Sequence, residues 1–102
     1  MNTLKLGDTE FILRCDLNVI DRIEREFVSV DACQKIAAAG AVRSAAAVKF
    51  LAAAMINEHF EAAGDSRRVT EEEVGRGLGG NVAPVLTIIF RELKDCMSAA
   101  SK

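Results

Sequence analysis

Two short runs near the start of the chain have a period of two: Leu4 and Leu6 alternate with Thr3 and Lys5, and Phe11 and Leu13 alternate with Glu10 and Ile12. Such alternation is typical of β-strands with one buried face. Gly7-Asp8 lies between the runs, and glycine at the first position of a two-residue loop suits a type II′ turn. The predicted partners across the hairpin are Leu6 with Thr9, Lys5 with Glu10, and Leu4 with Phe11. A lone hairpin is only marginally stable, so we expect helices to cover its apolar face.

From Asp16 onward, apolar residues recur at every third or fourth position, which indicates helices. Five helical segments are predicted: from Asp16 to Phe27, from Ser29 or Asp31 to Gly40, from Val42 or Ser44 to Ala63, from Thr70 to Gly79, and from Asn81 to Ser98. The predicted fold is therefore mainly α: a small helical bundle of about four or five helices with an N-terminal β-hairpin. The 102 residues are expected to form a single domain, with the hairpin in 1–15, the helical part in 16–98 and a frayed tail in 99–102.

Residues at the predicted helix ends support these boundaries. Asp16 is a predicted N-cap, and Thr70 followed three residues later by Glu73 matches a capping box. Pro84 falls in the first turn of the last helix, where proline is tolerated. The predicted C-terminal stops are Gly40, Gly64 and Gly79-Gly80.

Apolar stripes predict which face of each helix is buried. The stripes are Leu17, Ile20, Ile23 and Phe27 on the first helix; Val48, Leu51, Met55 and His59 on the third; and Val82, Val85, Ile89, Leu93 and Cys96 on the last. Side positions such as Val42, Phe50 and Leu51 add apolar surface, and residues 82–90 are dense in large apolar side chains. A bundle of this size does not cover them all, so we expect an exposed apolar surface. Such a surface commonly binds a protein, for example a helix in a groove between two helices.

Composition narrows the classes of function. Half of the residues are hydrophobic but only 5% are aromatic, because alanine runs at 37–39, 45–47 and 52–54 supply much of the total. The net charge of −2 disfavours general nucleic-acid binding. No stretch approaches the roughly 20 apolar residues that span a membrane, and residues 1–8 lack the apolar run of a secretory signal. Three widely spaced cysteines without a C-x-x-C motif fit a reducing cytoplasm.

Gly75, Gly77 and Gly80 match the G-x-G-x-x-G pattern of dinucleotide-binding loops. That motif needs a preceding strand and an acidic residue about 20 positions later. Here a helix-capping box precedes it, and the next acidic residues, Glu92 and Asp95, fall on the last helix. We therefore interpret residues 75–80 as a weakly helical connector and predict no cofactor.

The other reactive residues have structural explanations. His59, the only histidine, lacks an evident catalytic partner and suits the C-terminal part of a helix. Glu71–Glu73 suit the first turn of a helix, and Arg67-Arg68 suit a solvated loop because no aromatic residues accompany them. The thiols expected to be buried and inert are Cys15, Cys33 and Cys96. We predict no enzyme activity and no catalytic, cofactor-binding or metal-binding residue.

Four segments carry a resemblance to a known family. Leu4–Arg14 and Asp16–Glu24, a hairpin and an N-capped helix, are similar to the opening of the small tail assembly chaperones of long-tailed bacteriophages, in the form shared with gene transfer agents and prophages. Ser44–Ala63 and Val69–Gly75 resemble the middle of that family. The glycine-rich residues 75–80 and the long last helix depart from it.

The resemblance implies a non-enzymatic role in the bacterial host cytoplasm. Such proteins bind the long, helical tape measure protein and keep it soluble until tail tube subunits polymerise around it. No motif defines their binding surface, so no partner-binding residue is transferred. The alternative is a structural minor tail or tail tube component that self-assembles into homo-oligomers. A regulatory DNA-binding domain is a third hypothesis, which the acidic balance disfavours.

Overall fold

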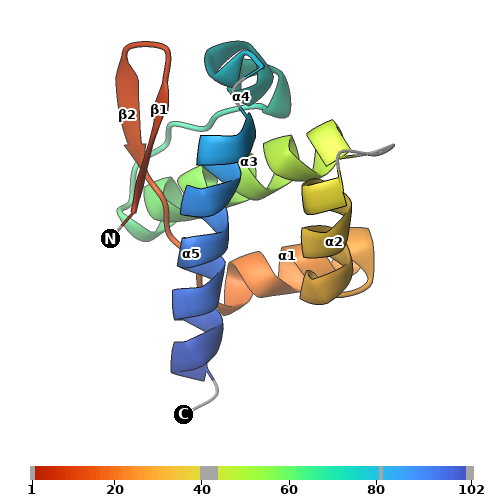
Figure 1. The fold of residues 1–102 in the computed structure, drawn as a ribbon. Coiled ribbons are helices and arrows are strands. Elements are labelled where there is room, and N and C mark those ends of the chain that lie inside the picture. Colours follow the sequence, from red (N-terminus) through yellow and green to blue (C-terminus); the bar gives the residue numbers. More distant parts are fainter. Residues whose placement is uncertain (1, 40–43, 81, 101–102) are drawn as a thin grey trace.

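The computed structural model describes residues 2–39, 44–80 and 82–100, and Figure 1 shows their arrangement. The predictions for Gly40, Val42 and Asn81 lie outside the described residues. The elements are β1 (Thr3–Leu6), β2 (Thr9–Ile12), α1 (Leu17–Phe27), α2 (Val30–Ala39), α3 (Ser44–Ala62), α4 (Glu71–Leu78) and α5 (Val82–Ala100). These described helices and the N-terminal hairpin confirm the predicted mainly α fold.

Strands β1 and β2 form the predicted hairpin in the predicted register. Leu6 pairs with Thr9, Lys5 with Glu10, and Leu4 with Phe11. Gly7 has a φ of 60°, whereas Asp8 is not among the residues with positive φ. A type II′ turn requires a positive φ only at its first central position, so the predicted turn type is confirmed. Leu4 and Leu6 are buried because α4 and α5 pack against β1.

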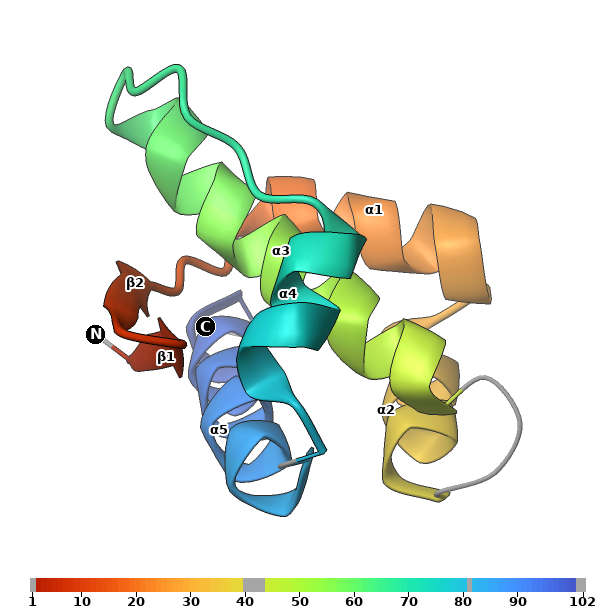
Figure 2. The ribbon, with the colours of Figure 1, turned by 90° about the horizontal axis from the view of Figure 1, so that it is seen from above.

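Helix α3 is the centre of the bundle and contacts α1, α2, α4, α5 and β2. Figure 2 shows α3 running through the molecule with the other elements around it. The six consecutive residues 51–56 are all buried, so α3 is enclosed on every side rather than along one stripe. Three of the six, Ala52–Ala54, are alanines, and small side chains let neighbouring helices approach closely. Two of the three alanine runs, 45–47 and 52–54, thus belong to the central helix.

Helix α1 begins at the predicted cap but buries a different face near its start. The Asp16 side chain accepts hydrogen bonds from the backbone N–H groups of Asn18 and Val19, at 3.1 and 3.4 Å. The prediction that Leu17 is buried is wrong, because its side chain is 72% exposed and Val19 takes the core position instead. Leu17 is the first residue of the helix, and the buried face of α1 begins two residues later. The buried residues of α1 are Val19, Ile20, Ile23 and Phe27.

Helix α4 packs against β1 through a glycine. The predicted capping box is present, because Thr70 and Glu73 exchange side-chain and backbone hydrogen bonds of 3.1 Å. A Cβ on Gly77 would lie 2.7 Å from the Leu6 Cβ and 3.1 Å from the Leu6 Cα, closer than two carbon atoms pack. The Gly7 N–H also donates to the Gly77 carbonyl at 3.3 Å. Gly77 therefore lies within the helix at a close approach. Of residues 75–80, interpreted as a weakly helical connector, 75–78 complete α4 and Gly79-Gly80 follow it.

We expect Gly77→Ala to destabilise the fold by about 1–3 kcal/mol, because the added methyl group must displace the β1 backbone. Gly75→Ala is the matched control in the same helix. Its Cβ would meet only the flexible Lys49 side chain, at 3.0 Å, and alanine favours a helix interior by up to about 1 kcal/mol. Urea unfolding should therefore move the two midpoints in opposite directions. Equal shifts for both variants would contradict the close approach.

Helix α5 covers one side of the core with Val85, Ile89 and Leu93, as predicted. Val82, at the start of the predicted stripe, is 36% exposed, so the burial predicted for it is wrong. The helix ends at Ala100, beyond the predicted end at Ser98, and residues 101–102 lie outside the described residues. Pro84 falls in the first turn, as predicted.

Candidate functional site

An open groove lies between α2 and the C-terminal half of α5. Its volume is about 690 Å³. The groove is lined by Val30, Asp31 and Gln34 from α2 and by Phe90, Leu93, Lys94 and Met97 from α5. Leu93 is fully buried, whereas the Met97 side chain is 43% exposed. The groove thus continues outward from the core and presents apolar side chains to solvent.

The apolar residues on the α5 side have helical spacing. Phe90, Leu93 and Met97 lie three and four positions apart, so they form one stripe along the face that α5 turns toward α2. An apolar stripe of this kind normally packs against a further helix. Because Met97 at the end of this stripe is 43% exposed, the outer part of the stripe is left open.

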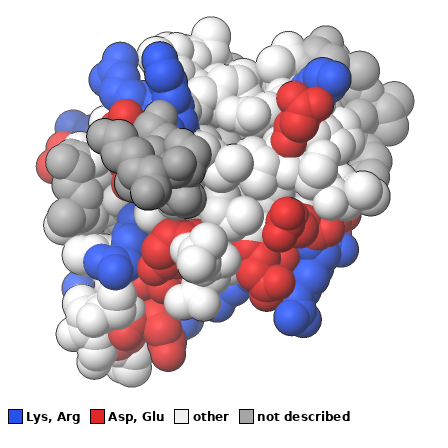
Figure 3. Space-filling view, turned by 90° about the horizontal axis from the view of Figure 1, so that it is seen from below, with Lys and Arg blue, Asp and Glu red and all other residues white. Residues whose placement is uncertain are grey.

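Charged groups border the groove. Lys35 Nζ lies 3.0 Å from Asp31 Oδ2 on the α2 side, and Lys94 is exposed on the α5 side. Figure 3 shows the face that carries the lower ends of α2 and α5, where a broad uncharged surface lies between charged side chains. A partner with an apolar centre and charged edges matches this distribution.

The sequence located the surplus apolar surface only in part. Leu51 is fully buried in the central helix, so its place on the predicted stripe is confirmed and the apolar surface expected from it is not present. Phe50 is half-buried, and its ring packs edge-on against Phe27, with the centroids 5.5 Å apart. Val42 lies outside the described residues. The density of apolar residues on the last helix did indicate Phe90, but its pairing with Val30 across the groove needs the tertiary structure.

A second exposed apolar side chain lies where α1 passes into α2. Val28 is 87% exposed and has a φ of 73° with a ψ of −47°. A positive φ is uncommon for a β-branched residue, because its side chain is crowded by the backbone in that region. Ser29 follows and caps α2, with its Oγ accepting the Ala32 N–H at 3.0 Å. The strained residue therefore makes the sharp turn that places Val30 in the groove.

A buried carboxyl group on α3, that of Glu58, is hydrogen-bonded to residues at the start of α1. Glu58 on α3 is 4% exposed, and its Oε2 accepts a hydrogen bond of 3.1 Å from Asn18 Nδ2. Burial raises the pKa of the Glu58 carboxyl, and its hydrogen bond with the Asp16 carboxyl raises it further. Burial also opposes ionisation of Asp16, but hydrogen bonds from Glu58, Arg14 and the α1 backbone outweigh it and lower the pKa of Asp16. The pair thus favours a protonated Glu58 beside an ionised Asp16.

We expect Glu58→Gln to stabilise the protein at neutral pH but not at pH 4. Because the pKa of Glu58 is raised in the folded protein, protonation of its carboxyl group stabilises the fold. This stabilisation is complete below the ordinary pKa of 4.5 and is lost as the pH rises through the folded-state pKa. Glutamine keeps a donor for Asp16 and an acceptor for Asn18 at every pH. Melting temperatures of both proteins between pH 4 and pH 8 test this, with the exposed Glu26→Gln as control. A constant difference across that range would contradict the protonated pair.

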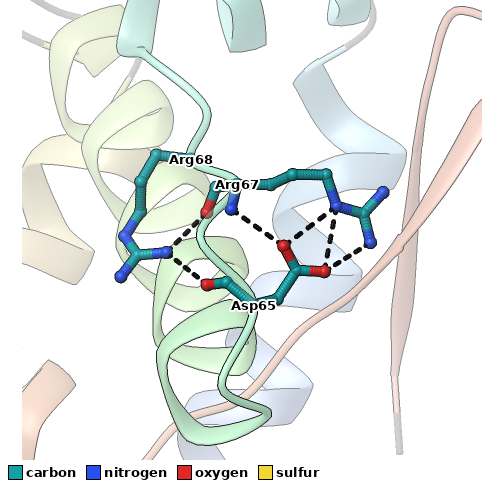
Figure 4. Close-up of polar contacts among 3 residues, drawn as sticks. All are labelled: Asp65, Arg67 and Arg68. Carbon is teal, nitrogen blue, oxygen red and sulfur yellow. Dashed lines mark hydrogen bonds and ion pairs between the residues drawn. The ribbon is translucent and has the colours of Figure 1, made fainter.

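The two adjacent arginines stabilise the loop after α3. Figure 4 shows Arg67 bound to the Asp65 carboxylate, with Nη2 2.7 Å from Oδ2, and Arg68 bound to the carbonyls of Asp65 and Arg67. Arg68 also pairs with Glu61. The Arg67 guanidinium lies 4.8 Å from the centre of the Phe60 ring and lowers the pKa of Asp65 through their hydrogen bonds. The positive charges are therefore paired within the loop, in agreement with the structural interpretation of these arginines.

The other polar candidates also lie where a structural role explains them. His59 is half-buried in the last turn of α3, and its ring lies 6.2 Å from that of Phe60. Glu71–Glu73 occupy the first turn of α4, where Glu73 completes the capping box. The glycine match begins inside α4, after a loop and a capping box, so the strand that a dinucleotide-binding motif needs is not in front of it.

The three cysteines differ in burial. Cys33 is fully buried on α2, as expected. Cys15 and Cys96 are half-buried, and their thiols lie against one another, which the spacing of the sequence did not reveal. Burial raises the pKa of the Cys15 thiol, and Cys96, Glu92 and Asp16 raise it further. Cys15 is therefore held in the protonated form at neutral pH.

Comparison of the chain with protein-family models, with curated proteins and with solved structures finds no match. Within residues 2–39, 44–80 and 82–100, no group of three or more His, Cys, Asp and Glu side chains is arranged to hold a metal ion. None of the helices in this part of the chain combines the length and the apolar character needed to cross a bilayer.

Proposed function

We propose that this chain is a phage or prophage tail assembly chaperone, which binds the tape measure protein in the bacterial cytoplasm and keeps it soluble during tail assembly. The role is non-enzymatic and needs no cofactor. The resemblance of the hairpin and first helix to that family motivates the proposal. The observation that carries it is the open apolar groove between α2 and α5.

The groove suits a helical partner. Phe90 and Met97 on one wall and Val30 on the other offer apolar contacts along the groove. An amphipathic helix with apolar residues at every third or fourth position fills such a site. Lys94 at the rim favours an acidic residue beside the apolar stripe of the partner. A long helical protein with repeated amphipathic segments, such as a tape measure protein, supplies this pattern many times.

The alternative function is a structural minor tail or tail tube component that self-assembles. It is favoured by the hairpin, because each strand of a two-stranded sheet is an edge strand. The two functions differ in where the protein is found. The chaperone is expected in host lysates bound to the tape measure protein and absent from finished particles, whereas a structural component is expected within them. Mass spectrometry of purified particles distinguishes these outcomes.

Co-expression tests the chaperone function directly. The tape measure protein encoded beside this chain would carry the affinity tag, and this chain would be untagged. We expect the two to co-purify at a constant ratio through size-exclusion chromatography. Failure to co-purify, with both proteins expressed, would overturn the proposal.

A further inference from the structure

We infer that Cys15 and Cys96 form a reversible dithiol–disulfide pair, which a low-molecular-weight disulfide such as oxidised glutathione converts to an intramolecular bond. The pair joins the link between β2 and α1 to the C-terminal half of α5. Nothing in the proposed chaperone role requires this bond, and its test does not depend on any partner.

Hydrogen bonds of Asn2 bring the segments that carry the two cysteines close together. The Leu13 N–H donates to the Asn2 carbonyl at 2.9 Å, and Asn2 Nδ2 donates to Glu92 Oε2 at 2.6 Å. Cys15 lies two residues after Leu13. Cys96 lies four residues after Glu92, so the two share a face of α5. Figures 1 and 2 both show the link between β2 and α1 passing alongside α5.

The segments that carry the two thiols are also fixed to the core. The Arg14 N–H donates to the Met55 carbonyl of the central helix at 3.1 Å, and the next residue but one, Asp16, caps α1. On α5, the fully buried Leu93 lies one turn before Cys96. Both thiols are half-buried against this core and face one another. The bond would therefore join two segments that the fold already holds in place.

The oxidation proceeds by two thiol–disulfide exchanges. In the first, the Cys96 thiolate attacks a sulfur of the small disulfide and releases one thiol, which leaves a mixed disulfide on Cys96. Cys15 then loses its proton and attacks the Cys96 sulfur, which forms the protein disulfide and releases a second small thiol. The two cysteines lose two electrons and two protons in total, and the small disulfide gains them as it becomes two thiols.

The environment of Cys15 sets the rate of this exchange. Burial and the neighbouring Cys96, Glu92 and Asp16 raise the pKa of Cys15 and disfavour its thiolate. Once Cys96 is part of the mixed disulfide it has no ionisable thiol, so it is no longer one of the groups that raise the pKa of Cys15. We therefore expect the pair to persist as thiols in a reducing cytoplasm and to oxidise faster as the pH rises above neutral.

Mass spectrometry of the full chain treated with oxidised glutathione tests the inference. We expect the intact mass to fall by two hydrogen atoms and peptide mapping to join Cys15 to Cys96, with Cys33 still reduced. Because the bond encloses most of the chain, the melting temperature should rise by on the order of 10 °C and return after reduction with dithiothreitol. Cys33→Ala should preserve the bond, whereas Cys15→Ser and Cys96→Ser should each prevent it.

Three results would overturn the inference: a bond that includes Cys33, a bond between two chains, or a glutathione adduct that persists on Cys15 or Cys96 without closure. Complete resistance to oxidation at pH 8 would do so as well. Because the mapping uses the unaltered chain, it remains informative if a cysteine variant fails to fold.

Discussion

Ile89→Asp is expected to unfold the protein at 25 °C or to leave it without fixed tertiary packing. Ile89 is fully buried at the centre of α5 and belongs to the core that α5 shares with α3. Loss of its packing alone costs about 2–5 kcal/mol. Burial of an unpaired carboxylate adds several kcal/mol, so the total approaches the whole stability of a small domain, about 5–15 kcal/mol.

Thermal unfolding followed by near- and far-ultraviolet circular dichroism measures this effect. Thr87→Asp is the matched control, because Thr87 is exposed on the same helix two positions earlier. We expect the control to keep the wild-type melting temperature within a few degrees. If Ile89→Asp melted like the control, the assignment of Ile89 to the core would be wrong.

Met97→Asp is expected to remove binding of the tape measure protein while leaving the fold intact. The Met97 side chain is 43% exposed at the outer part of the groove, so a charge there stays solvated in the free protein. In the complex, the same charge would lie against the apolar stripe of the partner helix and lose its solvation. We expect a stability change below about 1 kcal/mol and an affinity loss of at least tenfold.

Thr87→Asp is again the control, because it adds the same charge to α5 away from the residues that line the groove. Affinity for the purified tape measure protein, measured by biolayer interferometry, should fall for Met97→Asp and stay unchanged for Thr87→Asp. Equal affinities for the two variants would place the binding surface elsewhere on the molecule.

Local features of the fold were predictable because short-range chemistry determines them. The Gly7-Asp8 turn fixes the hairpin register, and the cap at Asp16 and the Thr70–Glu73 box define where two helices begin. In both caps the side chain accepts a hydrogen bond from the backbone N–H of the third residue after it, and this local bond does not depend on what packs around the helix. These elements were therefore correctly placed from the sequence.

Tertiary packing determines the features that the sequence did not reveal. Leu17 and Val19 are both apolar, and only the position of the neighbouring helices decides that Val19 is buried. Glycine weakens an isolated helix, but at Gly77 the close approach of β1, 2.7 Å from where a Cβ would lie, leaves room for no larger residue. The groove and the contact between Cys15 and Cys96 each join residues far apart in the chain. Periodicity within one helix carries no information on such pairs.

The soluble yield of the tape measure protein is the measurement that tests the central claim most directly. The tape measure protein would be expressed alone, with this chain, and with the Met97→Asp variant, and its soluble and insoluble fractions would be quantified. We predict that it is mostly insoluble alone, mostly soluble with this chain, and insoluble again with the variant. A tape measure protein that stays equally soluble or insoluble in all three cultures would contradict the proposed chaperone function.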